Sequence, residues 1–166
     1  MSTFTIRTSL LNDLPAITEI YNDAVLNSVA TFDTEPKQLS ERQDWFKLHE
    51  NPKYPMVSAV SFDEQVIGWG TLSPFHPRPA YDPTVEFSVY VHREYRGLGV
   101  GNAILEDLIN RGTILEYHSI IGLITGSNIA SLGMAEKFGF ERVGLYKEVG
   151  KKFGSWQDVA VVQLFL

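Results

Sequence analysis

The stretch Arg96-Gly97-Leu98-Gly99-Val100-Gly101 decides how the rest of the chain is interpreted. It follows the alternating run Val85 to Val91, which is typical of a strand, and it opens the helix-like run Asn102 to Gly112. Three glycines in this turn leave backbone N–H groups uncovered at the positive end of a helix dipole. A tight turn alone needs only one glycine, so the pattern predicts a site for a phosphate or pyrophosphate.

Composition limits the classes of protein to which this chain can belong. A length of 166 residues predicts a single domain over residues 1–166. The net charge of −6 argues against general binding to nucleic acid or to a membrane surface. The absence of Cys excludes disulfides and thiolate catalysis, and the four His lack zinc-site spacing, so no metal is expected. The polar start, Met1 to Arg7, and the lack of a long apolar run predict a cytoplasmic location with no membrane partner.

Periodicity divides the chain into alternating elements. Strands are expected at Phe4–Thr8, Met56–Ser61, Gln65–Leu72, Val85–Val91, Ser119–Thr125, Val143–Val149 and Val159–Leu166. Helices are expected after Asn12 or Asp13 with Pro15 in the first turn, after a Ser40/Gln43 capping box, over about Gly99 to Gly112, and over Ser131 to Phe138 before Gly139. Four prolines make Pro74 to Pro83 a loop. This order predicts a mixed α/β domain with one central sheet.

Three phosphate-binding patterns compete for the glycine turn. A P-loop needs Lys followed by Ser or Thr after its last glycine, whereas Asn102-Ala103 stands there. A Rossmann fingerprint follows the first strand of a parallel unit, whereas these glycines follow about the fourth strand and the preceding strands look antiparallel. The third pattern, Arg96-x-x-Gly99-x-Gly101, resembles the acyl-CoA-binding motif of the GNAT superfamily of N-acetyltransferases.

Other segments strengthen and narrow that resemblance. Asn128 and the closing run Glu136 to Phe140 are also similar to the superfamily. Four segments resemble the subfamily of phosphinothricin and methionine sulfoximine N-acetyltransferases: Thr31 to Pro36, Pro77 to Tyr81, Val85 to Val91 and Gly154 to Val159. The similarity runs from about Phe4 to Leu164. It implies a GNAT fold, α/β with a single mixed, mostly antiparallel central sheet flanked by helices, and a homodimer.

The resemblance implies that acetyl-CoA is the co-substrate and that a small amino acid or an analogue is acetylated on its α-amine. The residues implied for binding acetyl-CoA are the backbone of Arg96, Gly97, Leu98, Gly99, Val100 and Gly101 for the pyrophosphate, Tyr90 and Val91 for the pantetheine arm, and Asn128. The absence of Cys and of a serine in a nucleophile elbow favours direct attack by the amine, without an acyl-enzyme.

Glu86 is the candidate general base. It is a carboxylate within an apolar run of which one face must be buried, and burial raises a carboxyl pKa. An ammonium substrate must lose a proton before it attacks, either directly to this carboxylate or through water. The alternative is that Glu86 faces solvent or only forms an ion pair, with the substrate ammonium or with Arg78.

The candidate substrate residues are Phe32, Arg78 and Tyr81, with Glu86. Arg78 suits a bidentate clamp on a carboxylate, although a surface Arg in a proline-stiffened loop is the alternative. Phe32 matches a subfamily residue that packs over substrate, although an aromatic there is also compatible with a core role. The resemblance adds Lys152, Trp156 and Asp158, near the substrate or a dimer interface, for which packing is the alternative.

One position departs from the family pattern. Many superfamily members carry Tyr, and this subfamily often His, where Ala135 stands, and that residue can protonate the departing thiolate. No general acid is therefore assigned. Two other functions stay open: acetyl transfer to another amine, such as a protein N-terminus, a polyamine or an aminoglycoside, and an idle acyl-CoA-binding sensor.

Overall fold

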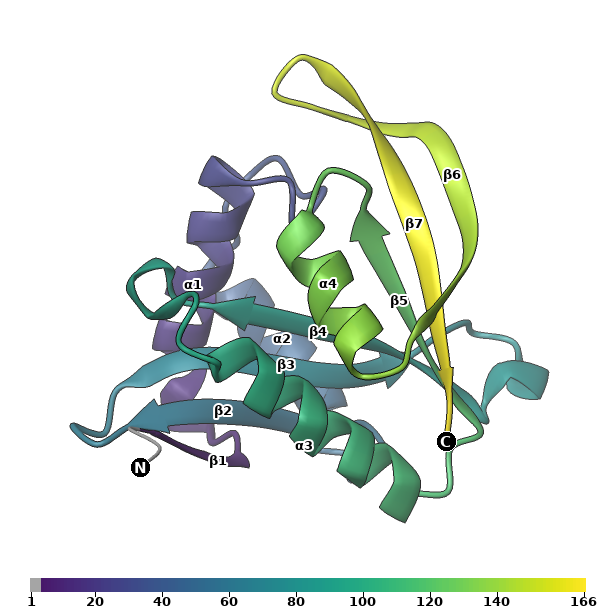
Figure 1. The fold of residues 1–166 in the computed structure, drawn as a ribbon. Coiled ribbons are helices and arrows are strands. Elements are labelled where there is room, and N and C mark those ends of the chain that lie inside the picture. The colour runs from purple at the N-terminus through teal and green to yellow at the C-terminus, as the bar shows by residue number, and fades with distance from the viewer. Residues whose placement is uncertain (1–3) are drawn as a thin grey trace.

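The computed structural model describes residues 4–166 and places them in a seven-stranded sheet with helices on both faces (Figure 1). The strands are β1 (Phe4–Thr8), β2 (Met56–Ser61), β3 (Val66–Pro74), β4 (Thr84–Val91), β5 (Ser119–Thr125), β6 (Glu141–Lys152) and β7 (Ser155–Phe165). Their order across the sheet is β1-β2-β3-β4-β5-β7-β6. Every neighbouring pair is antiparallel except β4 and β5, which confirms the predicted mixed, mostly antiparallel sheet.

Four α-helices among the described residues cover the sheet, namely α1 (Leu14–Asn27), α2 (Leu39–Leu48), α3 (Val100–Ile114) and α4 (Ile129–Lys137). The apolar side of α1 and Phe46 of α2 pack with Met56 and Trp69 on one face. On the other face, α3 and α4 pack with Leu72 and Phe87 of the central strands. Alternation along β3 and β4 thus divides the side chains between two cores. None of the helices in residues 4–166 has the length and hydropathy needed to cross a membrane.

The order of elements agrees with the sequence prediction, but some boundaries do not. The predicted Ser40/Gln43 capping box is wrong, because α2 begins at Leu39 and Gln38 is its N-cap. The backbone N–H of Gln38 donates to the Glu41 carboxylate at 2.7 Å, so the acidic residue satisfies the helix start. Strands β6 and β7 extend further towards their turn than the runs Val143–Val149 and Val159–Leu166 predicted. The two strands pair as far as Lys152 and Ser155, where the residues are mostly polar. Hydrophobic alternation therefore could not reveal these strand ends.

Strands β4 and β5 separate part of the way along their length, and this separation positions the site. They pair in parallel only from Thr84 to Glu86 on one strand and from Ser119 to Ile121 on the other. Beyond that point β4 continues to Val91 and β5 to Thr125, and the two strands diverge (Figure 1). Glu86 and Ile121 form the last pair, so Glu86 stands at the vertex of the opening.

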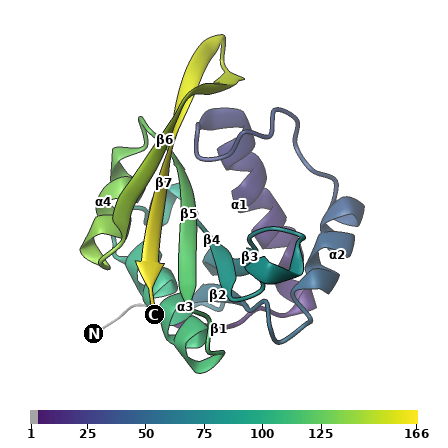
Figure 2. The same ribbon diagram turned by 90° about the vertical axis from the view of Figure 1, so that its right-hand side faces the viewer.

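The last two strands form a long hairpin that projects beyond the rest of the molecule (Figure 2). Its turn contains Phe153 and Gly154, both with positive φ values of 50° and 78°. The base of the hairpin continues the sheet from β5, whereas the projecting part extends beyond the end of β5.

Candidate active site

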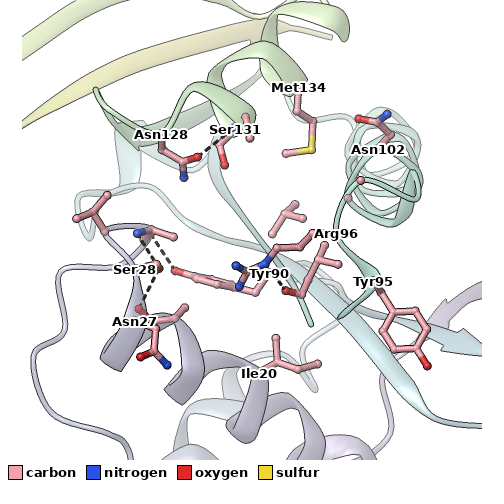
Figure 3. Close-up of a pocket in the computed structure, with 18 of the residues that line it drawn as sticks. Ile20, Asn27, Ser28, Tyr90, Tyr95, Arg96, Asn102, Asn128, Ser131 and Met134 are labelled. Carbon is pink, nitrogen blue, oxygen red and sulfur yellow. Dashed lines mark hydrogen bonds between the residues drawn. The ribbon is translucent and has the colours of Figure 1, made fainter. Parts of the chain in front are cut away.

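A cavity of about 730 Å³ lies in the opening between β4 and β5. Its walls come from the end of β4, the glycine turn, the first turn of α4 and the C-terminal end of α1 with the residues that follow it (Figure 3). Of the predicted cofactor residues, Tyr90, Val91, Arg96, Gly97, Gly99, Gly101 and Asn128 line it. The structure therefore brings most of the predicted acetyl-CoA residues to one cavity, from the end of β4, the glycine turn that closely follows it and the start of α4.

The glycine turn presents a row of free donors. Gly97 and Gly99 have φ values of +77° and +84°, which an L side chain adopts only with strain. A Cβ at either position would meet no heavy atom within 4 Å, so the space beside the turn is open. From Arg96 to Asn102, no backbone N–H donates a hydrogen bond within the described chain. Successive free N–H groups at the start of a helix are typical of anion-binding concavities, so this turn can accept a phosphate.

Leu98 and Val100 contribute to the turn through their backbone alone. The Leu98 side chain is exposed and that of Val100 is buried in the core, and neither side chain lines the cavity. Asn128 is the N-cap of α4, where its Oδ1 accepts the Ser131 N–H at 3.2 Å (Figure 3). Its Nδ2 makes no hydrogen bond to the described chain and is free for a ligand.

The Arg96 side chain crosses the end of β4. Its Nε donates to the carbonyl oxygen of Val91 at 3.2 Å, and its Nη2 lies 3.5 Å from an Asp23 carboxylate oxygen on α1. The carbonyl of Val91 belongs to the stretch of β4 predicted to pair with a pantetheine arm. Arg96 is more than half exposed, so solvent screens this ion pair and the guanidinium can move to a phosphate.

Glu86 lies on the same face of β4 as Ser88 and Tyr90, but it does not line the 730 Å³ cavity. Four residues along a strand separate it from Tyr90, a distance of about 13 Å. Its carboxylate is partly buried and makes no hydrogen bond or ion pair within residues 4–166, so the alternative of an ion pair with Arg78 is not formed. Burial raises the pKa of Glu86 above that of an ordinary glutamate.

Arg78 and Tyr81 lie in the loop that joins β3 to β4. This loop begins and ends at the Pro74–Val85 pair, next to Glu86 in the ladder. The Tyr81 ring packs against Phe75 and His76, with centroids 5.6 and 4.7 Å apart, and the Arg78 side chain has no partner among the described residues. Both residues lie outside the main cavity, at the end of the strand that carries Glu86.

Phe32 follows α1 and also lies outside the cavity lining. Its ring packs against Gly150 of β6, where a Cβ would approach the ring to 2.3 Å. Lys152, further along β6, is buried and donates from Nζ to the Thr31 carbonyl at 2.7 Å. The hairpin and the segment around Phe32 are therefore held together directly.

Trp156 and Asp158 have the local contacts of a hairpin. Trp156 is exposed beside the Lys151 ammonium, and the Asp158 carboxylate accepts the Glu148 N–H at 2.7 Å. Ala135 is fully buried in the core and does not line the cavity, whereas its neighbour Met134 does. The position that carries Tyr or His in many family members therefore supplies no acid here.

Several lining residues were not predicted from the sequence. Asn27 and Ser28 come from the end of α1, and Asn102, Ser131 and Met134 come from the first turn of α3 and from α4 (Figure 3). The apolar periodicity of α1 indicates a core helix and gives no sign that its C-terminus borders a cavity. No group of three or more His, Asp or Glu side chains that could hold a metal ion occurs in residues 4–166.

Comparison with known proteins identifies the family. The model of the acetyltransferase (GNAT) family matches residues 14–140. The L-methionine sulfoximine/L-methionine sulfone acetyltransferase of Pseudomonas aeruginosa is 38% identical over 161 residues, which cover 97% of this chain and 94% of that protein.

Two solved structures are also close to this chain. A phosphinothricin acetyltransferase from Sinorhizobium meliloti, in complex with acetyl-CoA, is 39% identical with a TM-score of 0.96, and the match covers 99% of this chain and 89% of that one. A ribosomal-protein-alanine N-acetyltransferase from Brucella melitensis is 34% identical with a TM-score of 0.94, over 98% and 99% of the two chains. The chain therefore belongs to the acetyltransferase (GNAT) family and is an acetyl-CoA-dependent acetyltransferase.

Proposed function

We propose that residues 1–166 form one domain that transfers the acetyl group of acetyl-CoA to the α-amine of a small amino acid or an amino-acid analogue. The observation that carries this proposal is the opening between β4 and β5. It has a row of free N–H donors at one end and an unpartnered carboxylate, Glu86, at its vertex. Similarity to acetyltransferases of methionine sulfoximine and phosphinothricin supports the substrate class.

The residues of the cavity fit acetyl-CoA. The free N–H groups from Arg96 to Asn102 and the open space beside Gly97 and Gly99 suit the pyrophosphate. The edge of β4 at Tyr90 and Val91 has no pairing with β5, so it suits a pantetheine arm, whose amides can pair with backbone as an added strand does. Bound in this way, the arm leads from the glycine turn along β4 towards Glu86.

The chemistry that we propose is direct attack. Glu86 takes a proton from the substrate ammonium, directly or through one water, and its raised pKa makes it a better acceptor than an exposed glutamate. The amine nitrogen then attacks the thioester carbonyl, so that a C–N bond forms and the C–S bond breaks. CoA leaves as a thiolate, which takes up the second proton that the nitrogen releases, through water. A backbone N–H of β4 polarises the carbonyl oxygen. No Cys is available for a covalent acyl-enzyme.

On the substrate side, we propose that Arg78 holds the substrate carboxylate and that Tyr81 and Phe32 enclose its side chain. The free guanidinium of Arg78 in the β3–β4 loop supports this role, because two parallel hydrogen bonds suit a carboxylate. A protein N-terminus is the second candidate, favoured by the similarity to a ribosomal-protein-alanine N-acetyltransferase.

A panel of amines separates these substrates. Release of CoA thiol from acetyl-CoA is measured with L-methionine sulfoximine, phosphinothricin, L-methionine, an alanine-initiated peptide, spermidine and an aminoglycoside. We expect turnover with the amino-acid analogues and only background rates with the cationic amines. Turnover only with the peptide would assign the second candidate. No release of CoA thiol with any of these amines, while acetyl-CoA still binds, would favour an idle acyl-CoA sensor.

We also propose that the enzyme is a homodimer and acts in the cytoplasm, where acetyl-CoA is available. Exposed apolar side chains on the projecting hairpin support a dimer, namely Val143, Leu145, Tyr146, Val149, Phe153 and Trp156. Contiguous exposed apolar surface is typical of an interaction face. Sedimentation velocity at micromolar protein is expected to give twice the monomer mass of 18.7 kDa, and a monomer mass would contradict the dimer.

A further inference from the structure

The segment from Val29 to Asp33 connects the cofactor cavity to Phe32. Val29 and Ala30 line the cavity, and Phe32 comes two residues later. The segment is fixed to the sheet at its start, because Thr125 Oγ1 on β5 donates to the Val29 carbonyl at 2.6 Å. Its other end carries the aromatic ring that the proposed function places against the substrate side chain.

One hydroxyl group holds both neighbours of Phe32. The Tyr21 hydroxyl on α1 donates to the Asp33 carboxylate at 2.5 Å and lies 2.9 Å from the Thr31 hydroxyl. Burial, and then the hydrogen bond to Asp33, raises the pKa of Tyr21 to about 12, so the phenol keeps its proton at neutral pH. The backbone on either side of Phe32 is therefore tied to one point on a buried helix.

The buried guanidinium of Arg42 packs against the Tyr21 ring. The Arg42 guanidinium on α2 lies 4.7 Å from the centroid of the Tyr21 ring and 3.5 Å from that of Trp45. Arg42 is only 6% exposed, and its Nε and Nη2 have no hydrogen-bond partner among the described residues. Its positive charge interacts with the Asp33 carboxylate. The Arg42 cation thus attracts the Tyr21 ring and stabilises the charged Asp33 carboxylate, which is the acceptor of the Tyr21 hydroxyl.

Phe32 is confined on its other side by the C-terminal hairpin. Three ring atoms lie between 2.3 and 3.2 Å from the place that a Cβ on Gly150 would occupy. Such distances leave no room for a methyl group, so the ring sits where it does only because residue 150 is glycine. A side chain there would push Phe32 away from the hairpin.

We infer that Tyr21 is a positioning residue that sets selectivity for the amine substrate. Its hydroxyl fixes Thr31 and Asp33, and it thereby seats Phe32 in the notch at Gly150. The role of Phe32 against the substrate rests on the proposed function. The contacts that hold the segment from Val29 to Asp33 do not depend on it. Tyr21 does not itself line the cavity, but its ring packs edge-on against Tyr90, which does, with centroids 5.2 Å apart. Removal of the hydroxyl alone leaves that ring contact in place, so the effect of the hydroxyl passes through Thr31 and Asp33 to Phe32.

The test is Tyr21→Phe, which keeps the ring and its contacts with Trp69, Tyr90 and Arg42 while removing only the hydroxyl. We expect KM for L-methionine sulfoximine to rise about tenfold, with kcat and the KM for acetyl-CoA within about twofold of wild type. Within residues 31–34, exchange of the Asp33 amide, which donates to Thr31 Oγ1 at 3.2 Å, is expected to accelerate at least about tenfold, with or without turnover.

Two further variants keep the test decisive. Tyr117→Phe is the matched control, because it removes a phenol that donates to the Lys53 carbonyl at 2.5 Å outside the cavity. It should leave both KM values and the exchange of residues 31–34 unchanged. Gly150→Ala displaces Phe32 from the opposite side and should also raise KM for the sulfoximine while sparing acetyl-CoA.

The outcomes separate the inference from the proposed function. Wild-type selectivity and exchange in Tyr21→Phe would overturn the inference, whatever the substrate is. Faster exchange in Tyr21→Phe, together with a wild-type enzyme that acetylates no amino acid, would support the positioning of Phe32 by Tyr21. The same result would refute the proposed amino-acid substrate. Equal losses in kcat and in acetyl-CoA affinity would show a general structural role, and they would also overturn the inference.

Discussion

Replacement of Glu86 by Gln is expected to lower kcat about a hundredfold or more, with the KM for acetyl-CoA within about twofold. The amide has nearly the same shape but cannot accept a proton from the substrate ammonium. Acetyl-CoA is proposed to bind at the glycine turn and the end of β4, about 13 Å away along the strand, so its binding should not change. Steady-state kinetics of CoA-thiol release with L-methionine sulfoximine measure both constants.

The pH dependence of kcat is a second test of Glu86 as the general base. The Glu86 carboxylate must be deprotonated to act as the proposed base, and burial raises its pKa, so wild-type kcat should fall as pH drops through that raised pKa. The acid limb should therefore lie above the range of an ordinary glutamate, and Glu86→Gln should lose it. Glu141→Gln, on β6 of the same sheet, is the control with an exposed carboxylate. Retention of most of kcat and of the acid limb in Glu86→Gln would contradict the assignment.

Gly99→Val is expected to weaken CoA binding at least about a hundredfold. The new side chain must adopt a φ near the observed +84°, which costs an L residue about 1–2 kcal/mol. Its Cβ would enter the open space beside the free N–H row, where the pyrophosphate is proposed to bind. Isothermal titration with CoA measures the loss without any amine substrate.

A second glycine serves as the control for this variant. Gly133 on α4 is exposed, and a Cβ there would also meet no heavy atom within 4 Å. It has no positive φ and does not line the cavity, so Gly133→Val should keep the wild-type affinity for CoA. Wild-type binding by Gly99→Val would exclude the glycine turn as the phosphate site.

Local sequence predicted the parts of the site that depend on local geometry. The glycine turn is such a part, because its spacing and the helix that follows are visible within a few residues. The partial burial of Glu86 was also predictable from strict alternation along one strand. The separation of β4 from β5 was not, because it depends on the register between strands more than thirty residues apart. That separation turns a buried glutamate into one at the vertex of an opening.

The contacts that position Phe32 could not be predicted from the sequence, for a different reason. Tyr21 follows the apolar periodicity of α1, and that pattern indicates nothing beyond packing. Its hydroxyl partners follow the helix in sequence, and Gly150 lies on the distant hairpin. Arg42 lies on a largely polar helix, where an arginine is usually exposed, yet it is buried among aromatic rings. Contacts of this kind are set by tertiary packing and leave no local pattern.

One competition experiment tests the proposed reaction most directly. The enzyme is incubated with acetyl-CoA and an equimolar mixture of L-methionine sulfoximine, an alanine-initiated peptide and spermidine, and the acetylated products are identified by mass spectrometry. We expect the α-N-acetyl derivative of the sulfoximine to dominate and to disappear with Glu86→Gln. Acetylation confined to the peptide or to spermidine would contradict the amino-acid assignment.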